Sequence, residues 1–275
     1  MIKAHEQGTL PRRDVDVSVL FISYNRSDLL EIALQSVRER MDFGNLRVEF
    51  VVSDDASDGV HPSRIRSLPF DKYVLSAANR GLGNNCNKGI TATEGCYILQ
   101  IEDDCEFVGS RTLLFTAIEI LQAGRDVGII QLTHQTPGVP HEVRCLGDGT
   151  QYLVFENDAI PQKRDCSARP YSNQPHLKRR QFWEDIGPYR EGVPMTDMEL
   201  NYQQRVACQK RWRVASIVQA PSFKHLGAAR SFNPCVLRAR RLERLEHYPL
   251  LGPFLRRLRP TVRLVRDWVR DFRAC

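Results

Sequence analysis

Short apolar runs alternate along this chain with segments whose apolar residues recur every three or four positions. Residues 15–23 and 48–53 are runs rich in β-branched side chains, which is typical of buried strands. The segment between them carries apolar residues at helical spacing, namely Leu29, Leu30, Ala33, Leu34 and Val37. A strand, a helix and a strand in this order predict a right-handed βαβ unit with two parallel strands.

The same alternation continues along most of the chain. Further strands are predicted at residues 72–75, 96–101, 127–132, 151–155 and 213–218, and helices at 84–93, 110–121 and most of 179–206. Residues 134–175 are rich in Pro, Gly and Asp and are predicted to be irregular, with one or two strands. The pattern therefore predicts an α/β fold built on a mixed, mostly parallel sheet flanked by helices.

The composition is that of an ordinary globular protein, but its charge is unevenly placed. Of the 275 residues, 42% are hydrophobic and 26% are charged, and the net charge is +6. Residues 237–275 hold eleven arginines and four acidic residues, so this tail carries +7 and the rest of the chain −1. Because the positive charge lies in the tail, we expect no nucleic-acid partner for the remainder.

Cysteine usage and hydropathy bound the compartment. Eight cysteines are scattered without the CxxC or Cys/His spacing of a zinc site. Residues 1–16 are polar and charged, and no apolar run approaches the roughly 20 residues that span a bilayer. These features predict free thiols in a cytoplasmic protein, with a peripheral position at the inner face of the membrane as a further option.

Two of the predicted strands end on acidic clusters. Asp54 and Asp55 follow one strand, and Glu102, Asp103 and Asp104 follow another. Ligands of open α/β sheets bind beyond the carboxyl ends of the strands, so these side chains are expected to face one crevice. Clustered carboxylates suit Mg²⁺ or Mn²⁺, and such an ion suits a diphosphate. The alternative interpretation is that each cluster is a solvated turn.

Five pieces of the sequence, taken in order, resemble the family 2 glycosyltransferases, which have the GT-A fold. They are the strand and Tyr-Asn at 17–26, the helix at 29–37, Ser-Asp-Asp-Ala-Ser-Asp at 53–58, the Asn- and Gly-rich segment 79–89, and the strand ending on Glu-Asp-Asp at 95–104. The resemblance implies a nucleotide-sugar-binding half at 15–108 and an acceptor-binding half at 109–236. Residues 1–14 would be an extension, and residues 237–275 a basic helical tail.

The resemblance also implies roles on the donor side. Residues matched to the nucleotide sugar are Ile22, Tyr24, Arg26, Asp55, Arg80, Glu102 and Asp103. Among them Asp55 would bond the nucleobase, in a pocket lined by Ile22 and Tyr24, and Asp103 would lie near the ribose or sugar. Asp104 would be the main carboxylate at Mn²⁺ or Mg²⁺. Glu102 replaces the usual first Asp of this motif, so the division of roles among the three acids stays open.

The second half resembles the family less closely. The match makes Asp197 the general base, with Glu199 at a second acidic, acceptor-side position, and Thr196 stands where a Glu is usual. His225 would join the metal or the diphosphate. Trp183 would stack on an acceptor sugar, or else fill the core. For Asp197 the competing interpretation is a helix N-cap.

The arginine-rich tail has an amphipathic pattern after Pro260. Its apolar residues fall on one helical face, namely Val262, Val265, Trp268, Val269 and Phe272. Such a helix lies on an anionic membrane surface, which suits a lipid-linked acceptor, or packs on the catalytic part or on a second subunit of a homodimer. Both options stay open.

The function predicted from the resemblance is metal-dependent, inverting transfer of a sugar. A nucleoside-diphosphate sugar would be the donor, and a hydroxyl of a glycan, glycolipid or small glycoside the acceptor. One alternative is a binding module for nucleotide sugars or carbohydrates that has lost catalysis, to which Glu102 and Thr196 point. A nucleotidyltransferase is a third option, but residues 23–26 lack its Gly-rich phosphate loop.

Overall fold

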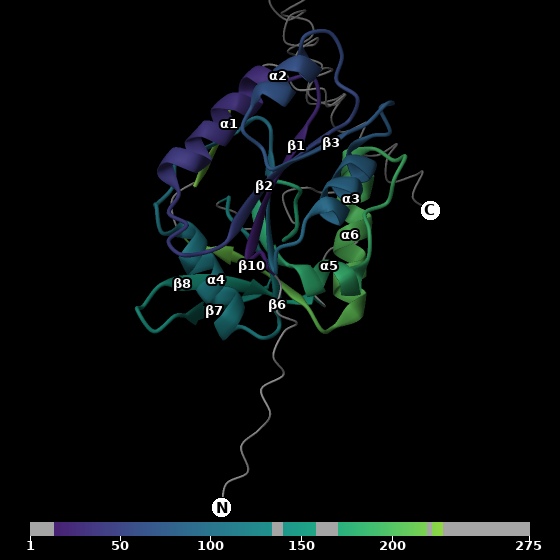
Figure 1. Cartoon of the computed structure of the whole chain (residues 1–275). Coiled ribbons are helices and arrows are strands. Elements are labelled where there is room, and N and C mark those ends of the chain that lie inside the picture. The colour runs from purple at the N-terminus through teal and green to yellow at the C-terminus, as the bar shows by residue number, and fades with distance from the viewer. Residues whose placement is uncertain (1–13, 134–139, 158–169, 219–221, 228–275) are drawn as a thin grey trace, which may run out of the picture. The chain divides into compact units, whose positions relative to one another are not determined.

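The computed structural model describes residues 14–133, 140–157, 170–218 and 222–227 (Figure 1). The helices and strands described all lie within one compact unit, Met1–Leu226. The predicted tail helix and most of the N-terminal extension lie outside the described residues, so both stay predictions. Within the described ranges, no helix has the length and apolar character needed to cross a membrane.

One nine-stranded sheet organises the fold, with the strand order β3-β2-β1-β4-β9-β6-β10-β8-β7. Its strands are β1 Val17–Ser23, β2 Val48–Asp54, β3 Lys72–Leu75, β4 Tyr97–Glu102, β6 Val127–Gln131, β7 His141–Cys145, β8 Gln151–Phe155, β9 His176–Arg179 and β10 Arg213–Ile217. The run from β3 to β4 is parallel, as is the β6–β10 pair, whereas β9, β8 and β7 pair antiparallel to their neighbours. The predicted mixed, mostly parallel sheet is confirmed.

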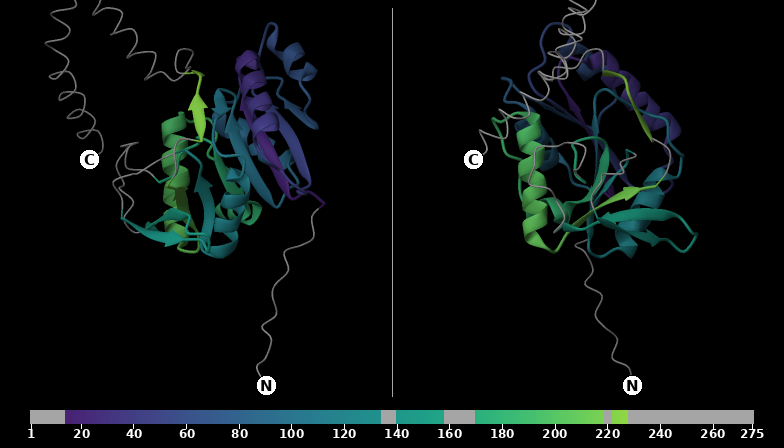
Figure 2. Two further views of the ribbon diagram at one scale, coloured as in Figure 1. Left: turned by 90° about the vertical axis from the view of Figure 1, so that its left-hand side faces the viewer. Right: turned by 180° about the vertical axis from the view of Figure 1, so that it is seen from behind.

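Helices cover both faces of this sheet, as Figures 1 and 2 show. They are α1 Ser27–Arg40, α2 His61–Ser67, α3 Leu82–Ala92, α4 Leu113–Ala123, α5 Arg180–Ile186 and α6 Met195–Gln209. In Figure 1, α1 and α4 lie on one side of the strands, and α3, α5 and α6 on the other. Two short strands, β5 Cys105–Phe107 and β11 Phe223–His225, form a separate antiparallel pair.

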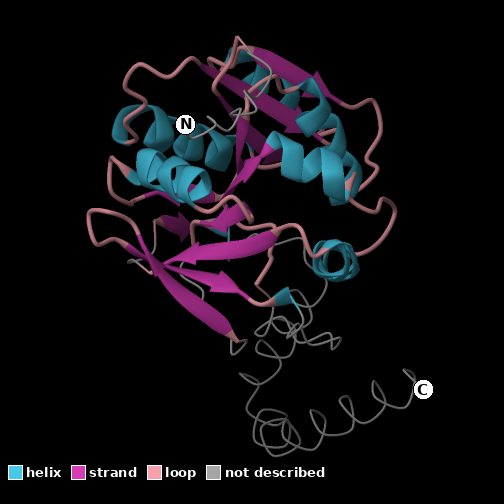
Figure 3. Cartoon of the chain, turned by 90° about the horizontal axis from the view of Figure 1, so that it is seen from below, coloured by secondary structure: helices cyan, strands magenta, loops and turns pink. Residues whose placement is uncertain are grey.

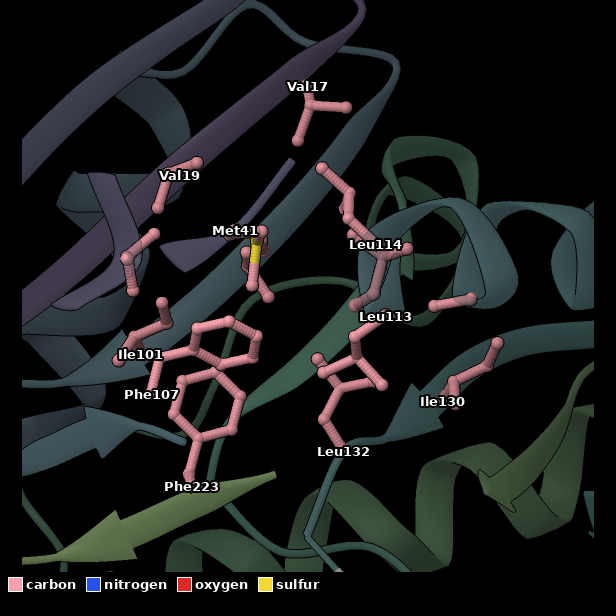
Figure 4. Close-up of a cluster of buried hydrophobic side chains, with 14 of the residues drawn as sticks. Val17, Val19, Met41, Ile101, Phe107, Leu113, Leu114, Ile130, Leu132 and Phe223 are labelled. Atoms are coloured by element: carbon pink, nitrogen blue, oxygen red, sulfur yellow. The ribbon is translucent and has the colours of Figure 1, made fainter. Parts of the chain in front are cut away.

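Alternation along β1 explains how one strand supports two cores. Val17, Val19 and Phe21 point into a cluster shared with α1 and α4, which Figure 4 shows in part. Leu20 and Ile22 point into a second cluster built with α3, α5 and α6. Because both faces of β1 are buried, its sequence is a continuous apolar run instead of an alternating one.

The strand β9 was not predicted. Its four residues, His-Leu-Lys-Arg, carry no apolar pattern, yet they are inserted between β4 and β6 and pair antiparallel with both. Figure 3 shows the molecule from below, with all described strands in magenta. Helix α2 and the short strands β5 and β11 were also missed. Backbone hydrogen bonds to β4 on one side and β6 on the other explain how a polar tetrapeptide forms a central strand.

The cysteine prediction is confirmed as far as the structure extends. The cysteines within the described ranges are free thiols, namely Cys86, Cys96, Cys105, Cys145 and Cys208.

Close packing of α3 on the sheet generates a stability prediction. A Cβ on Gly89 would lie 2.8 Å from the Ser53 Cβ and 2.9 Å from Leu20 Cδ1. Gly89→Ala is therefore expected to lower the free energy of unfolding by about 1–3 kcal/mol, despite the better helix propensity of Ala. Urea unfolding measures the change.

Gly147→Ala is the matched control, because no atom of the described residues lies within 4 Å of a Cβ built there. It should change the free energy of unfolding by less than about 0.5 kcal/mol. Equal stability of the Gly89 and Gly147 variants would contradict the packing argument.

Candidate active site

Strand β1 brings the two acidic clusters to one edge of the sheet. β1 lies between β2 and β4 and is parallel to both. Just beyond the carboxyl ends of these strands, the Asp55 amide donates to the Ser23 carbonyl at 3.2 Å, and the Asp103 amide donates to the Ile22 carbonyl at 3.0 Å. The predicted convergence of the acidic strand ends is confirmed for the backbone.

Arg26 joins Asp103 and Asp104 in a buried ion-pair cluster. Its Nη2 lies 2.6 Å from Asp103 Oδ1, and its Nη1 donates a hydrogen bond to Asp104 Oδ2. The second oxygen of Asp103 accepts the Tyr24 amide at 3.0 Å. Burial raises the pKa of Asp103 to about 7, and the Arg26 guanidinium opposes that rise. Arg26 comes from the loop that leads into α1, so residues far apart in sequence build this cluster.

Glu102 and Glu199 lie beside the same cluster. The backbone N–H of Asn173 donates to Glu199 Oε1 at 2.7 Å, and its side-chain Nδ2 donates to Glu102 Oε1 at 3.5 Å. Burial raises the pKa of Glu102 to about 8, with the charges of Asp104 and Glu199 adding to the effect. Sequence reasoning missed Asn173, because it lies in the segment predicted to be irregular and no motif marks it.

The donor atoms at this edge fit a divalent cation. Glu102, Asp104 and Cys105 each offer one ligand atom, and these atoms lie within 4.8 Å of one another. Burial raises the pKa of the Cys105 thiol, so it is a poor ligand, and two hard carboxylates remain. His225, about half exposed, lies with Nε2 3.4 Å from Asp104 Oδ2. These groups would hold Mn²⁺ or Mg²⁺ together with phosphate oxygens.

Asp55 holds the loop before α3. Its two carboxylate oxygens accept the Arg80 amide at 3.0 Å and the Gly81 amide at 2.8 Å. The Arg80 side chain is exposed and helps to line a cavity of about 270 Å³. Lys88 lines the same cavity, but its amine donates to Ser76 Oγ at 2.6 Å and to backbone carbonyls. Asp55 thus shapes the loop on which Arg80 is carried.

Two of the residues predicted for the acceptor side, Asp197 and Trp183, lie in different environments. Asp197 is half-buried in the first turn of α6, where the helix dipole stabilises a negative charge. The N-cap interpretation of Asp197 is wrong, because α6 begins at Met195 and Pro194 occupies the cap position. Trp183 packs against the second core cluster, and its buried indole Nε1 has no hydrogen-bond partner among the described residues.

The two residues predicted to line the nucleobase pocket, Ile22 and Tyr24, differ in burial. Ile22 is buried within the second core cluster, whereas Tyr24 is half-buried and fixed by its backbone to Asp103. Among the predicted site residues, the structure brings five close together, namely Arg26, Glu102, Asp103, Asp104 and His225. Glu199 is linked to Glu102 through Asn173.

A network of largely buried hydrogen bonds extends from Glu102 through Asn173 to Gln100 and Lys178. Lys178 on β9 donates to Gln100 Oε1 at 2.9 Å and to the Tyr189 hydroxyl at 3.0 Å. Gln100 in turn donates to Asn173 Oδ1 at 2.9 Å. Burial lowers the pKa of Lys178 to about 7. Neither Lys178 nor Gln100 was predicted, because no motif marks them and their hydrogen-bond partners are distant in the sequence.

Comparison with known proteins now adds the family. Residues 18–143 match the family described as glycosyl transferase family 2. The fold is similar to that of the mannosyltransferase PcManGT from Pyrobaculum calidifontis, solved with GDP-Man and Mn²⁺. Its TM-score is 0.56 at 20% identity, over 90% of this chain and 68% of that chain. A search of curated proteins returned no match.

Two further solved structures share the fold. S. aureus TarS 1-349 in complex with UDP-GlcNAc has a TM-score of 0.52 at 15% identity, over 88% of this chain and 69% of that chain. GalNAc-T7 with UDP, GalNAc and Mn²⁺ has a TM-score of 0.51 at 15% identity, over 74% of this chain and 42% of that chain.

The sheet, its helices and these similarities define a protein of the GT-A fold, the class in which nucleotide-sugar glycosyltransferases are built. The predicted resemblance is confirmed over residues 18–143, which match the glycosyl transferase family 2 model.

The lowered pKa of Lys178 generates a pH prediction. Between its folded pKa of about 7 and the unfolded value of 10.5, the unfolded chain binds one more proton than the folded one. Stability should therefore rise with pH across this window, and fall as pH drops toward 7. Relative to Lys178→Met, the wild type should gain up to about 1.4 kcal/mol per pH unit.

Urea unfolding of both proteins at pH 7, 8 and 9 measures this difference, in which other titrating groups cancel. Lys224→Met, at an exposed position on β11, is the control and should show no such slope. A pH-independent difference between wild type and Lys178→Met would show that Lys178 is charged throughout.

Proposed function

We propose that this protein is a metal-dependent, inverting glycosyltransferase that moves a sugar from a nucleoside-diphosphate sugar to a hydroxyl acceptor. The observation that carries the proposal is the buried cluster of Arg26, Asp103 and Asp104 at the carboxyl edge of a GT-A sheet. That edge is where this class of sheet binds its ligands, and the cluster is too buried to be a solvated turn.

On the donor side, the proposal keeps the roles implied by the family match. Asp55 would bond the nucleobase, in a pocket lined by Ile22 and Tyr24, and Arg80 would contact phosphate. Glu102 and Asp103 would lie near the ribose and sugar. The related folds solved with GDP-Man and UDP-GlcNAc support a nucleotide-sugar donor, but they leave its base and sugar open.

The metal would be held by Asp104 and His225, with the Glu102 carboxylate close enough to be a further ligand, and when bound it would neutralise charge on the leaving diphosphate. Two of the related folds were solved with Mn²⁺, which supports this assignment.

Asp197 is proposed as the general base. Its carboxylate would take the proton of the acceptor hydroxyl as that oxygen bonds to the anomeric carbon and the bond to the diphosphate breaks. Attack from the face opposite the leaving group inverts the anomeric centre, so a single carboxylate suffices. Glu199 and Trp183 would border the acceptor, which is a glycan, a glycolipid or a small glycoside.

The basic tail belongs to the same proposal. If it lies on an anionic membrane surface at the cytoplasmic face, it would bring the site to a lipid-linked acceptor. If it packs on a second subunit, the protein would be a homodimer.

A thermal-shift panel of UDP-, GDP- and dTDP-sugars with and without Mn²⁺ tests donor and metal together. The cognate donor at a hundredfold excess over its Kd should stabilise the protein by about 2.7 kcal/mol, and only in the presence of metal. Asp104→Asn should lose the metal-dependent part. If no nucleotide sugar shifts the wild type, the transferase proposal fails.

Asp197→Asn is expected to bind the donor as the wild type does and to lose transfer by at least about 100-fold, because the general base is gone. Donor turnover and acceptor glycosylation, measured side by side, check this. The matched control is Glu119→Gln, an exposed carboxylate on α4. Retained transfer by Asp197→Asn would rule out this base, and donor binding without transfer by the wild type would favour the binding-module alternative.

A further inference from the structure

Arg26 occupies the position at which a metal would meet Asp104. Its guanidinium is fork-shaped, with one nitrogen on Asp103 Oδ1 at 2.6 Å and the other hydrogen-bonded to Asp104 Oδ2. Only 16% of the Arg26 side chain is exposed, against 0% for Asp103 and 3% for Asp104. A desolvated pair of this kind needs its opposite charge, because an unpaired buried carboxylate is strongly unfavourable.

The cluster holds more acidic side chains than one guanidinium can pair with. Glu102 and Glu199 lie beside the two aspartates, and the half-exposed His225 is a second basic partner of Asp104. Arg26 is therefore the cation that holds Asp103 and Asp104 together while no metal is bound. A divalent ion would bring further positive charge, and it would bind to carboxylate oxygens of the same cluster.

Arg26 and a metal compete for one atom. Asp104 Oδ2 already contacts Arg26 Nη1 and lies 3.4 Å from His225 Nε2, whereas Asp104 Oδ1 faces the Cys105 thiol at 3.8 Å. A cation bonded to Asp104 Oδ2 at about 2.1 Å would be in contact with the guanidinium and would repel it. The Arg26 guanidinium and a divalent ion would therefore weaken each other's interaction with Asp104 Oδ2.

We propose that Arg26 is a built-in counter-cation that is exchanged for the divalent ion, so that metal alone binds weakly. On the proposed function, the anion that receives the released guanidinium is the donor diphosphate, which arginine binds through two parallel hydrogen bonds. Metal and nucleotide then bind cooperatively, because the nucleotide provides a new partner for Arg26. The exchange would leave Asp103 and Asp104 with a cationic partner at every stage.

The experiment measures Mn²⁺ binding to the full chain from the electron paramagnetic resonance signal of free Mn²⁺. Without nucleotide, Arg26→Gln should bind Mn²⁺ at least about tenfold more tightly than the wild type, within the usual range of coupling between two sites. Adding UDP or GDP should tighten Mn²⁺ binding in the wild type and much less in Arg26→Gln. Arg64→Gln, an exposed arginine paired with Glu31, should behave as the wild type does.

A second variant and a second readout guard against misfolding. Arg26→Lys keeps the charge but cannot span both carboxylates, so its Mn²⁺ affinity without nucleotide should lie between the other two. Thermal unfolding should show that Arg26→Gln is less stable than the wild type without metal and gains more stability from Mn²⁺.

The proposal is overturned if folded Arg26→Gln binds Mn²⁺ no more tightly than the wild type, or if no variant binds Mn²⁺ at all. Its failure is separable from that of the proposed function, which is judged by sugar transfer. Turnover of a nucleotide sugar with unchanged Mn²⁺ binding in Arg26→Gln would refute the exchange alone. The predicted Mn²⁺ pattern without any transfer would refute the transferase alone.

Discussion

The ion pairs from Arg26 to Asp103 and Asp104 are the interaction on which the site depends. Parallel strands carry their carboxyl ends to one edge, and there the chain buries acids that would repel one another without a cation. Removing one partner of such a buried pair costs about 3–5 kcal/mol. Under the exchange that we propose, the same pairing would also prepare the acids for a metal, because a divalent ion would take over the role of the guanidinium.

The second half of the fold is tied to the first by contacts that need close approach. Asn87 on α3 exchanges hydrogen bonds with the backbone of Tyr189 at 2.8 and 2.9 Å, and Gly83 lies against the Arg190 carbonyl where a Cβ would be 2.4 Å away. Asn173 then links Glu102 to Glu199. The first turn of α6, with Asp197, is thereby held relative to the edge of the sheet that carries the acids.

Much of this could be predicted from sequence, and particular residues show where prediction stopped. The strands predicted at 72–75 and 151–155 are β3 and β8 with the same bounds, and the acids at 102–104 do lie at a strand end. By contrast, β9 went unseen because a polar tetrapeptide has no periodicity, and its pairing comes from β4 and β6. Asn173 and Lys178 were missed for the same reason, since their partners are distant in sequence.

The sequence alone determined most of the strands and helices, and that acids follow β2 and β4, because burial on one or two faces imposes a local pattern on apolar residues. It also determined the family resemblance. Only the tertiary structure decided that Arg26 pairs with Asp103 and Asp104, 77 and 78 positions later in the chain, that Asp55 accepts hydrogen bonds from loop amides, and that Asp197 lies inside a helical turn. Ion pairs and hydrogen bonds between distant segments leave no periodic trace, because they depend on how elements are placed and not on what each element is.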